Sequence, residues 1–214
     1  MAYSLPILLS TAYLPPVQYI GKFLNADTVY IEKRENYQKQ SYRNRCYIYG
    51  ANGRQCLVIP IIKKHGEKTP ITEVEIDYGK PWQKIHLKSI QSAYRTSPFY
   101  EYYADDFNAF FREETVQLFE WNSHLLHYIL RILDITVNVK VSQTYEKKPL
   151  PVHDLRQSIH PKARLHKSDE HFTPVPYVQV FQERYGFLPN LSIIDLLFSE
   201  GPNARNILKM NNEQ

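Results

Sequence analysis

The residues best suited to chemistry are the cations that gather between positions 33 and 45. This stretch holds one acidic residue, Glu35, and five basic ones, which are Lys33, Arg34, Lys39, Arg43 and Arg45. Arginine presents a planar fork that matches a carboxylate or a phosphate, and asparagine can hydrogen-bond a sugar or an amide. The stretch therefore predicts a site for an anionic or sugar substrate, bound by Lys39, Asn44 and Arg45. The alternative is an exposed basic loop that binds nothing.

A histidine is the candidate for acid–base chemistry. In residues 82 to 97, whose apolar periodicity predicts a helix, His86 falls on the inward side one turn after Trp82. A neutral imidazole there could accept a proton from an attacking amine or hydroxyl, so His86 is the predicted catalytic residue. A buried structural histidine is the alternative. Tyr13 and Trp82 are the aromatic residues predicted to stack on a sugar or a base.

Other familiar motifs are missing from the sequence. It has no glycine-rich phosphate loop, no G-x-S-x-G elbow and no Cys–His nucleophile signature. His124 and His127, like the four histidines of residues 153 to 171, lack metal-ligand spacing, so we expect neither a metal nor another cofactor. Glu114 is expected on the apolar side of a long helix, paired with an arginine, and Asp195 is expected to cap a helix.

The elements that must position these residues indicate an α/β fold of the mixed α+β kind. Residues 6–10 and 28–32 are predicted strands on either side of a helix that begins at Pro16. Further strands are predicted over 71–77 and 135–141, and a second long helix over 106–133. The expected architecture is a central mixed sheet with an opening strand–helix–strand unit, packed by two long helices, with a helical C-terminal part.

A hairpin is predicted over residues 45–60. A type I′ turn on Asn52-Gly53 would place Cys56 opposite Tyr49. A longer loop could instead bring Cys46 and Cys56 near each other. Because no secretory signal precedes them, both cysteines are expected to be reduced.

Composition and length bound the domain organisation. The 214 residues, 43% hydrophobic and 22% charged, suffice for one domain with an appended lobe and exclude wholesale disorder. We expect an α/β core over residues 1–141, a proline- and histidine-rich loop or arm over 142–176, and a C-terminal helical segment over 177–214 that packs on the core. The middle segment has the composition of a lid, an arm or a linker.

Charge and hydropathy set the expected partners and compartment. The net charge of +4 favours anionic partners but is too small to indicate nucleic acid. No apolar run reaches the roughly 18 residues of a membrane span, and the first residues lack the basic region of a signal peptide. We therefore expect a cytoplasmic protein with a small anionic or sugar substrate, no nucleic-acid partner and no membrane span.

Several short stretches together resemble a known family. They are Tyr13-Leu14-Pro15, Tyr37-Gln38-Lys39, Arg43-Asn44-Arg45, Trp82 with His86, Tyr94 with Pro98, and residues 191–198 with Gly201. On these motifs the chain is similar to the WbqC-like family of bacterial proteins over nearly its whole length. Many relatives have Pro-Trp followed by Gly-Tyr where this chain continues from Pro15-Pro16 to Tyr19. The resemblance adds Tyr94 to the predicted substrate-binding residues.

The resemblance also implies a biological setting. Members of the family occur in gene clusters for O-antigen and other surface polysaccharides, and transfer of an amino acid such as glycine to a sugar has been suggested for them. The leading hypothesis is a transferase that modifies an activated amino sugar. The alternative is a non-catalytic nucleotide-sugar-binding or scaffolding protein, which 17 tyrosines would suit. A closed pocket holding Lys39, Asn44, Arg45 and His86 would favour the enzyme, and an exposed tyrosine patch would favour the alternative.

Overall fold

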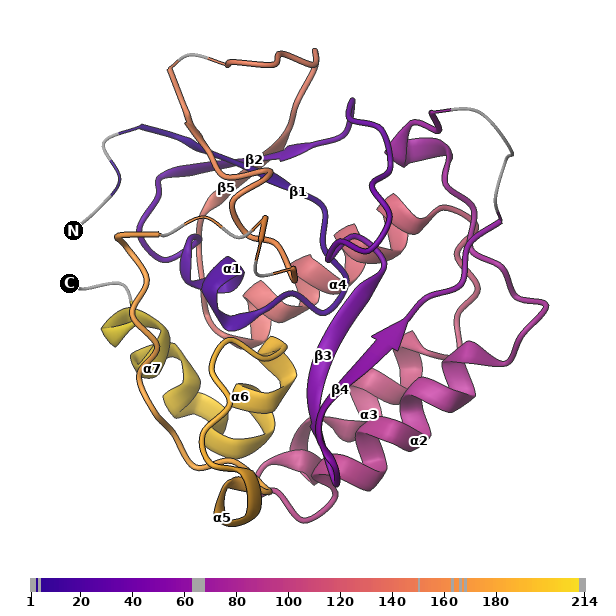
Figure 1. The fold of residues 1–214 in the computed structure, drawn as a ribbon, viewed down its shortest axis with the longest axis vertical. Helices are drawn as coiled ribbons and strands as arrows, with labels where there is room; N and C mark the ends of the chain where they lie inside the picture. Colours follow the sequence, from indigo (N-terminus) through magenta and orange to yellow (C-terminus); the bar gives the residue numbers. More distant parts are fainter. Residues whose placement is uncertain are drawn as a thin grey trace.

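The fold combines a small parallel sheet, a separate hairpin and helices that pack around both (Figure 1). The computed structural model describes residues 3, 5–62, 68–149, 151–162, 164–165, 167 and 169–211. The strands are β1 (Ile7–Ser10), β2 (Thr28–Glu32), β3 (Arg45–Gly50), β4 (Gly53–Val58), β5 (Asn138–Val141) and β6 (His153–Asp154). The helices are α1 (Val17–Gly21), α2 (Trp82–Tyr94), α3 (Tyr100–Phe110), α4 (Leu118–Ile132), α5 (Gln182–Tyr185), α6 (Ile193–Glu200) and α7 (Ala204–Met210), with 3₁₀ turns η1 (Ile71–Glu73) and η2 (Gly201–Asn203).

The parallel sheet has the strand order β5-β2-β1-β6. β1 lies in its centre, buried along its whole length, which explains its nearly continuous apolar sequence. β1 and β2 are parallel and are joined through α1, as the opening strand–helix–strand pattern predicts, and Ser10 pairs with Glu32 where both strands end. The strand predicted over 135–141 is confirmed from Asn138 onward, as β5, which pairs with β2. Strand β6 comes from the proline- and histidine-rich segment and completes the sheet.

The predicted hairpin is confirmed, but its turn lies one residue earlier than predicted. Gly50 pairs with Gly53, so the two-residue loop is Ala51-Asn52 and Cys56 lies opposite Tyr47 rather than Tyr49. Gly53 has φ of +90°, which favours glycine at the residue that closes this loop. Cys46 is buried and Cys56 is exposed, and both are free thiols.

The predicted helix over 106–133 is wrong, because the chain forms two helices, α3 and α4, with a break between them. At the break, the backbone of residues 116 to 118 is hydrogen-bonded to residues 74 and 76, and Gln117 forms an isolated bridge with Glu75. The predicted strand over 71–77 is likewise wrong, because this segment is a 3₁₀ turn followed by isolated bridges. Glu114 lies in the break and is exposed, so its predicted place on an apolar helix face is also wrong.

Phe198 is a central contact between the C-terminal helices and the core. Phe198 of α6 is fully buried and contacts the rings of Tyr94, Tyr100, Tyr103 and Phe107. Gly201 ends α6 with φ of +52°, as its predicted place after the helix requires. The α/β fold class with a helical C-terminal part is therefore confirmed, with its strands divided between a parallel sheet and an antiparallel hairpin. Among the residues that the structure describes, no helix is long and apolar enough to cross a membrane.

Candidate functional site

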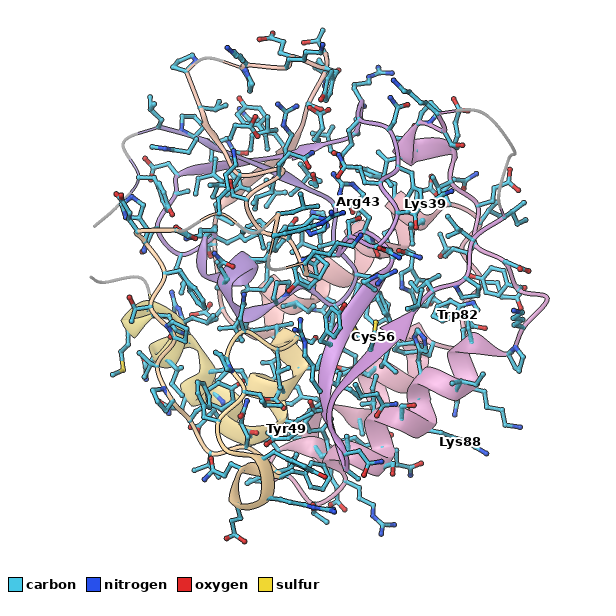
Figure 2. The ribbon with its side chains drawn as sticks, viewed as in Figure 1. Lys39, Arg43, Tyr49, Cys56, Trp82 and Lys88 are labelled. Carbon is cyan, nitrogen blue, oxygen red and sulfur yellow. The ribbon has the colours of Figure 1, made fainter. Side chains whose placement is uncertain are left out.

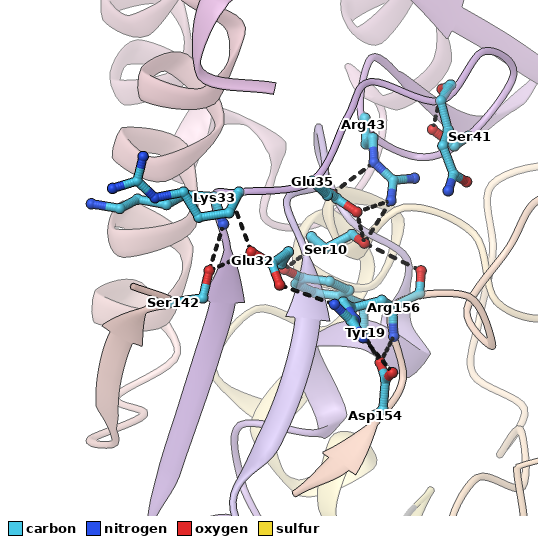
Figure 3. A network of polar contacts seen from close by, with 12 residues as sticks. Ser10, Tyr19, Glu32, Lys33, Glu35, Ser41, Arg43, Ser142, Asp154 and Arg156 are labelled. Carbon is cyan, nitrogen blue, oxygen red and sulfur yellow. Dashed lines mark hydrogen bonds and ion pairs between the residues drawn. The ribbon is translucent and has the colours of Figure 1, made fainter. Parts of the chain in front are cut away.

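A network of buried charges lies where β1 and β2 end (Figure 3). Arg43 is 3% exposed and forms a two-pronged contact with Glu35, in which its Nε donates to Oε1 at 2.8 Å and its Nη2 donates to Oε2. The same Nη2 donates to the Ser10 hydroxyl at 2.7 Å, and that hydroxyl donates to Glu35 at 3.0 Å. A buried ion pair needs such hydrogen bonds, because each lost solvation shell must be replaced.

A second arginine ties the segment after β6 to the same strand ends. Arg156 is 5% exposed and donates to Glu32 at 3.0 Å and to both carboxylate oxygens of Asp154, at 2.8 and 2.7 Å. The hydrogen bonds that Arg156 donates to Asp154 raise the pKa of Arg156 against the opposing effect of burial. Glu32 also accepts a hydrogen bond from Ser142. The two arginines therefore join four separate parts of the chain at the edge of the parallel sheet.

A small cavity separates the two arginines. It has a volume of about 10 Å³, enough for about one water molecule, and its polar lining includes Ser10, Thr11, Tyr42, Arg43 and Arg156. Ligands of open α/β sheets tend to bind at the carboxyl ends of the strands, where this cavity lies. Leu155 and Ile159 also line it, and at this volume it can hold a water or a single polar group but not a whole sugar.

The solvent-facing side of the hairpin carries a larger cationic surface next to this cavity. Side chains alternate along a strand, so Arg45, Tyr47 and Tyr49 of β3 lie on the same face of the hairpin. Cys56 and Arg54 of β4 pair with Tyr47 and Tyr49 and share that face. The Arg54 guanidinium lies 3.7 Å from the centre of the Tyr47 ring, and Tyr47 contacts the ring of Tyr42 edge-on. Tyr42 also lines the cavity, so it joins the two regions. Residues 36 to 62 contain no Asp or Glu, so the charges that this segment contributes to the surface are all positive.

The three predicted residues of the basic run differ in exposure. Lys39 is exposed, Arg45 is half-buried and Asn44 is 4% exposed. Asn44 donates to the carbonyl oxygen of Ile59 at 2.8 Å, which is a contact that holds the hairpin. Among the described residues Asn44 Oδ1 has no donor and Arg45 Nε has no acceptor, but only Arg45 is charged and partly exposed. Of the three, Arg45 is the side chain best placed to bind an anionic group.

His86 lies inward as predicted, in a cage of aromatic rings. It is 3% exposed and contacts the rings of Trp82, Phe111 and Tyr13. Its Nδ1 lies 2.8 Å from the Tyr13 hydroxyl, and the ring also hydrogen-bonds the backbone carbonyl of Val58. Burial lowers the pKa of His86 to about 4, although the hydrogen bond to Val58 opposes this. The imidazole is therefore neutral at physiological pH, and its Nδ1 is engaged by Tyr13 inside the protein.

Tyr94 belongs to a different buried cluster. Its hydroxyl accepts from the Tyr49 backbone N–H at 2.9 Å and donates to Asp195 at 2.7 Å. Asp195 also accepts hydrogen bonds from Tyr177 and Gln179, and burial raises its pKa even though these contacts oppose the rise. The prediction that Asp195 caps α6 is therefore wrong, since its carboxylate joins three segments of the core and no side-chain cap is formed at Ser192.

The structure thus brings the predicted residues together only in part. Tyr13, Trp82 and His86 form one buried group, Tyr94 lies in another, and Lys39 and Arg45 belong to the cationic run. Arg43 lies in the predicted basic run but was not among the predicted site residues. Ser10, Arg54 and Arg156 were not predicted either. Ser10 was detectable as the polar residue that ends an apolar strand. Among the described residues no group of three or more potential ligands could hold a metal ion.

The fold and this site define a class, namely an α/β protein with a cationic, tyrosine-bearing surface beside the carboxyl edge of a parallel sheet. The chain belongs to the WbqC-like protein family, which matches residues 11–207. It is also similar to a protein of Mycobacterium tuberculosis described as "Uncharacterized protein Rv1507c", with 26% identity over 94% of this chain and 96% of that protein. No solved structure matches the chain at a significant level.

Proposed function

We propose that the protein binds an anionic sugar ligand of the nucleotide-sugar kind, in the assembly of bacterial surface polysaccharides such as O-antigen. The observation that carries this proposal is the outer face of the hairpin, where Arg45, Tyr47 and Arg54 lie together and Arg45 Nε has no acceptor among the described residues. Guanidinium groups bind phosphates through paired hydrogen bonds, and a tyrosine ring offers a stacking surface for a sugar or a base.

Each part of such a ligand has a matching group on this face. The phosphates would lie against Arg45 and Arg54, with the exposed Lys39 adding charge at the edge. The sugar would extend past Tyr47 towards Tyr42, which borders the cavity at the end of β1. A hydroxyl of the ligand could enter that cavity, where Ser10 and Arg43 supply hydrogen-bonding groups.

A transferase that modifies the bound sugar is the second candidate. The Ser10 hydroxyl lines the cavity and donates to Glu35, and this contact favours a transferase, because a carboxylate behind a hydroxyl can accept a proton through it. In transfer to an amino sugar, the amine nitrogen would form a bond to the acyl carbon, the bond to the leaving group would break, and the amine proton would pass to a base. His86 could be that base only if its hydrogen bond with Tyr13 opened, so the geometry favours a binding protein over a transferase.

A thermal-shift screen against nucleotide sugars, aminoacyl donors and simple phosphates tests the proposal. A ligand at a hundredfold excess over its Kd stabilises the folded state by about 2.7 kcal/mol, which raises the Tm of a chain this long by about 5 °C or more. We expect such a shift from a nucleotide sugar, and its loss in Arg45→Gln but not in the surface control Lys147→Gln.

If no nucleotide sugar raises the Tm, or if Arg45→Gln keeps the full shift, the proposal is wrong. Mass spectrometry of the recovered sugar after incubation with an aminoacyl donor separates the two candidates. An added aminoacyl mass identifies the transferase, and an unchanged sugar identifies the binding protein.

A further inference from the structure

Helices α2 and α3 carry opposite charges on neighbouring outer faces. Helix α2 contains Lys84 and Lys88 but no Asp or Glu, and both lysines are exposed. Figure 2 shows Lys88 pointing away from the molecule. Helix α3 contains Glu101, Asp105 and Asp106 but no Lys or Arg, and all three acids are exposed. A single sign of charge on each of two adjacent helices is a specific pattern, because mixed charges are the usual state of a solvated helix face.

The two helices border one open hollow of about 500 Å³. Its walls include Lys84 and Lys88 from α2, and Arg112 extends the positive charge just after α3. Its floor is partly apolar and includes Leu87 and Phe111. No acidic residue lines this hollow, although the acids of α3 lie on the same helix that forms its far wall.

These charges have no ion-pair partner among the residues that the structure describes. No ion pair joins either lysine to the acids of α3 in the part of the chain that the structure describes, where the ion pairs lie elsewhere. Asp106 accepts a hydrogen bond from Tyr128, whereas Glu101 and Asp105 extend into solvent. The surface therefore presents a positive helix and a negative helix side by side, each available to a complementary surface.

We propose that this surface is the interface of a symmetric homodimer, with a second copy of this chain as the occupant. A two-fold axis through the hollow would place α2 of each copy against α3 of the other, so that the same lysine–carboxylate contacts form twice. Interfaces of this kind are self-complementary by symmetry. A patch with adjacent helices of opposite charge meets that requirement, whereas a uniformly acidic partner would be repelled by α3.

The size of the surface predicts a weak, salt-sensitive dimer. Helix α2 has 13 residues and is therefore about 20 Å long, and two helices side by side cover a width of about 20 Å. The resulting patch of roughly 400 Å² per copy is about half of what a stable interface buries on each side. Exposed ion pairs weaken as salt screens them, so the dimer should dissociate at high ionic strength.

Sedimentation velocity of the full chain, over a range of protein and salt concentrations, tests the proposal. We expect a species of twice 25.3 kDa to grow with protein concentration at low salt and to disappear at high salt. The double variant Lys84→Glu/Lys88→Glu should be monomeric, and so should Glu101→Lys/Asp105→Lys. Mixing these two variants should restore the dimer, because the heterodimer pairs opposite charges on both sides of the axis. Lys147→Glu, on an exposed residue elsewhere, is the matched control and should dimerise like the wild type.

Once circular dichroism shows that each variant is folded, every outcome either supports or overturns the proposed dimer. Restoration on mixing supports the proposal, since a variant damaged for another reason would not be rescued by its opposite. A wild-type chain that stays monomeric at low salt overturns the proposal. A dimer that survives either reversal, or two folded variants that fail to pair, also overturns it.

Discussion

The buried His86 should make the protein unstable in acid, and the size of the effect follows from its surroundings. The pKa of His86 is about 4 in the folded protein, against an ordinary value of 6.5, because burial disfavours the charged ring. Between these two pH values the unfolded chain binds a proton that the folded chain does not. Stability is therefore unaffected above about pH 6.5 and is lost as the pH falls towards 4. The loss attributable to this one residue is about 2 kcal/mol between pH 7 and pH 5, and about 3 kcal/mol by pH 4.

Urea unfolding of the wild type and of His86→Gln at several pH values isolates this contribution. Glutamine can keep a hydrogen bond but does not titrate, and all other ionisable groups are common to both proteins. Trp82 and Trp121 provide the fluorescence signal, since both are buried and their rings lie 5.4 Å apart in the same aromatic cluster. The stability difference between the two proteins should shrink by about 2 kcal/mol from pH 7 to pH 5. Parallel pH profiles would refute the assignment of a depressed pKa to His86.

Three further substitutions test the packing, each against a milder change. Gly201→Ala should lower the free energy of unfolding in urea by about 2 to 4 kcal/mol, because the new Cβ would lie only 2.6 Å from a ring carbon of Phe99. In the milder change Gly53→Ala the new Cβ meets no neighbouring atom, so the loss should be about 1 kcal/mol. Asp195→Asn should cost about 2 to 3 kcal/mol, because a buried acceptor of three hydrogen bonds is altered, and the exposed Asp134→Asn should be nearly neutral by thermal melting. Arg43→Met should lower the free energy of unfolding by about 3 to 5 kcal/mol, because it leaves the carboxylate of Glu35 buried and unpaired. Removing that carboxylate as well should recover part of the loss, which a double-mutant cycle measures.

Sequence patterns predicted those elements that are determined by residues close together in the chain. The apolar run of β1, the inward side of α2 and the glycine after α6 each follow from residues within one element. The break between α3 and α4 has no such local signal. Phe111 and Leu118 are both buried and lie seven residues apart, which is the spacing of two helical turns. The pairing of residues 116–118 with residues 74 and 76 decides the break, and that contact spans about forty residues of sequence.

The site was predictable in composition but not in arrangement. The basic run predicts a positive surface, but Arg43, which precedes β3, turns inward to Glu35, whereas Arg45 at the start of β3 is half-buried on the outer face, and composition does not reveal this difference. Asp195 has the spacing of a helix cap, but Tyr94, one of its partners, lies 101 residues away in sequence. Arg156 lies in a segment without periodicity, and its partner Glu32 is 124 residues away. Long-range polar contacts of this kind leave no mark in a single sequence.

Hydrogen exchange with and without the nucleotide sugar that most raises the Tm tests the central claim most directly. Bound ligand should slow exchange of the amides on the β3–β4 hairpin, and of residues 9–12 beside the cavity, while the amides of α6 stay unchanged. Protection confined to other elements, with no change at the hairpin, would contradict the assignment of ligand binding to the surface of Arg45, Tyr47 and Arg54.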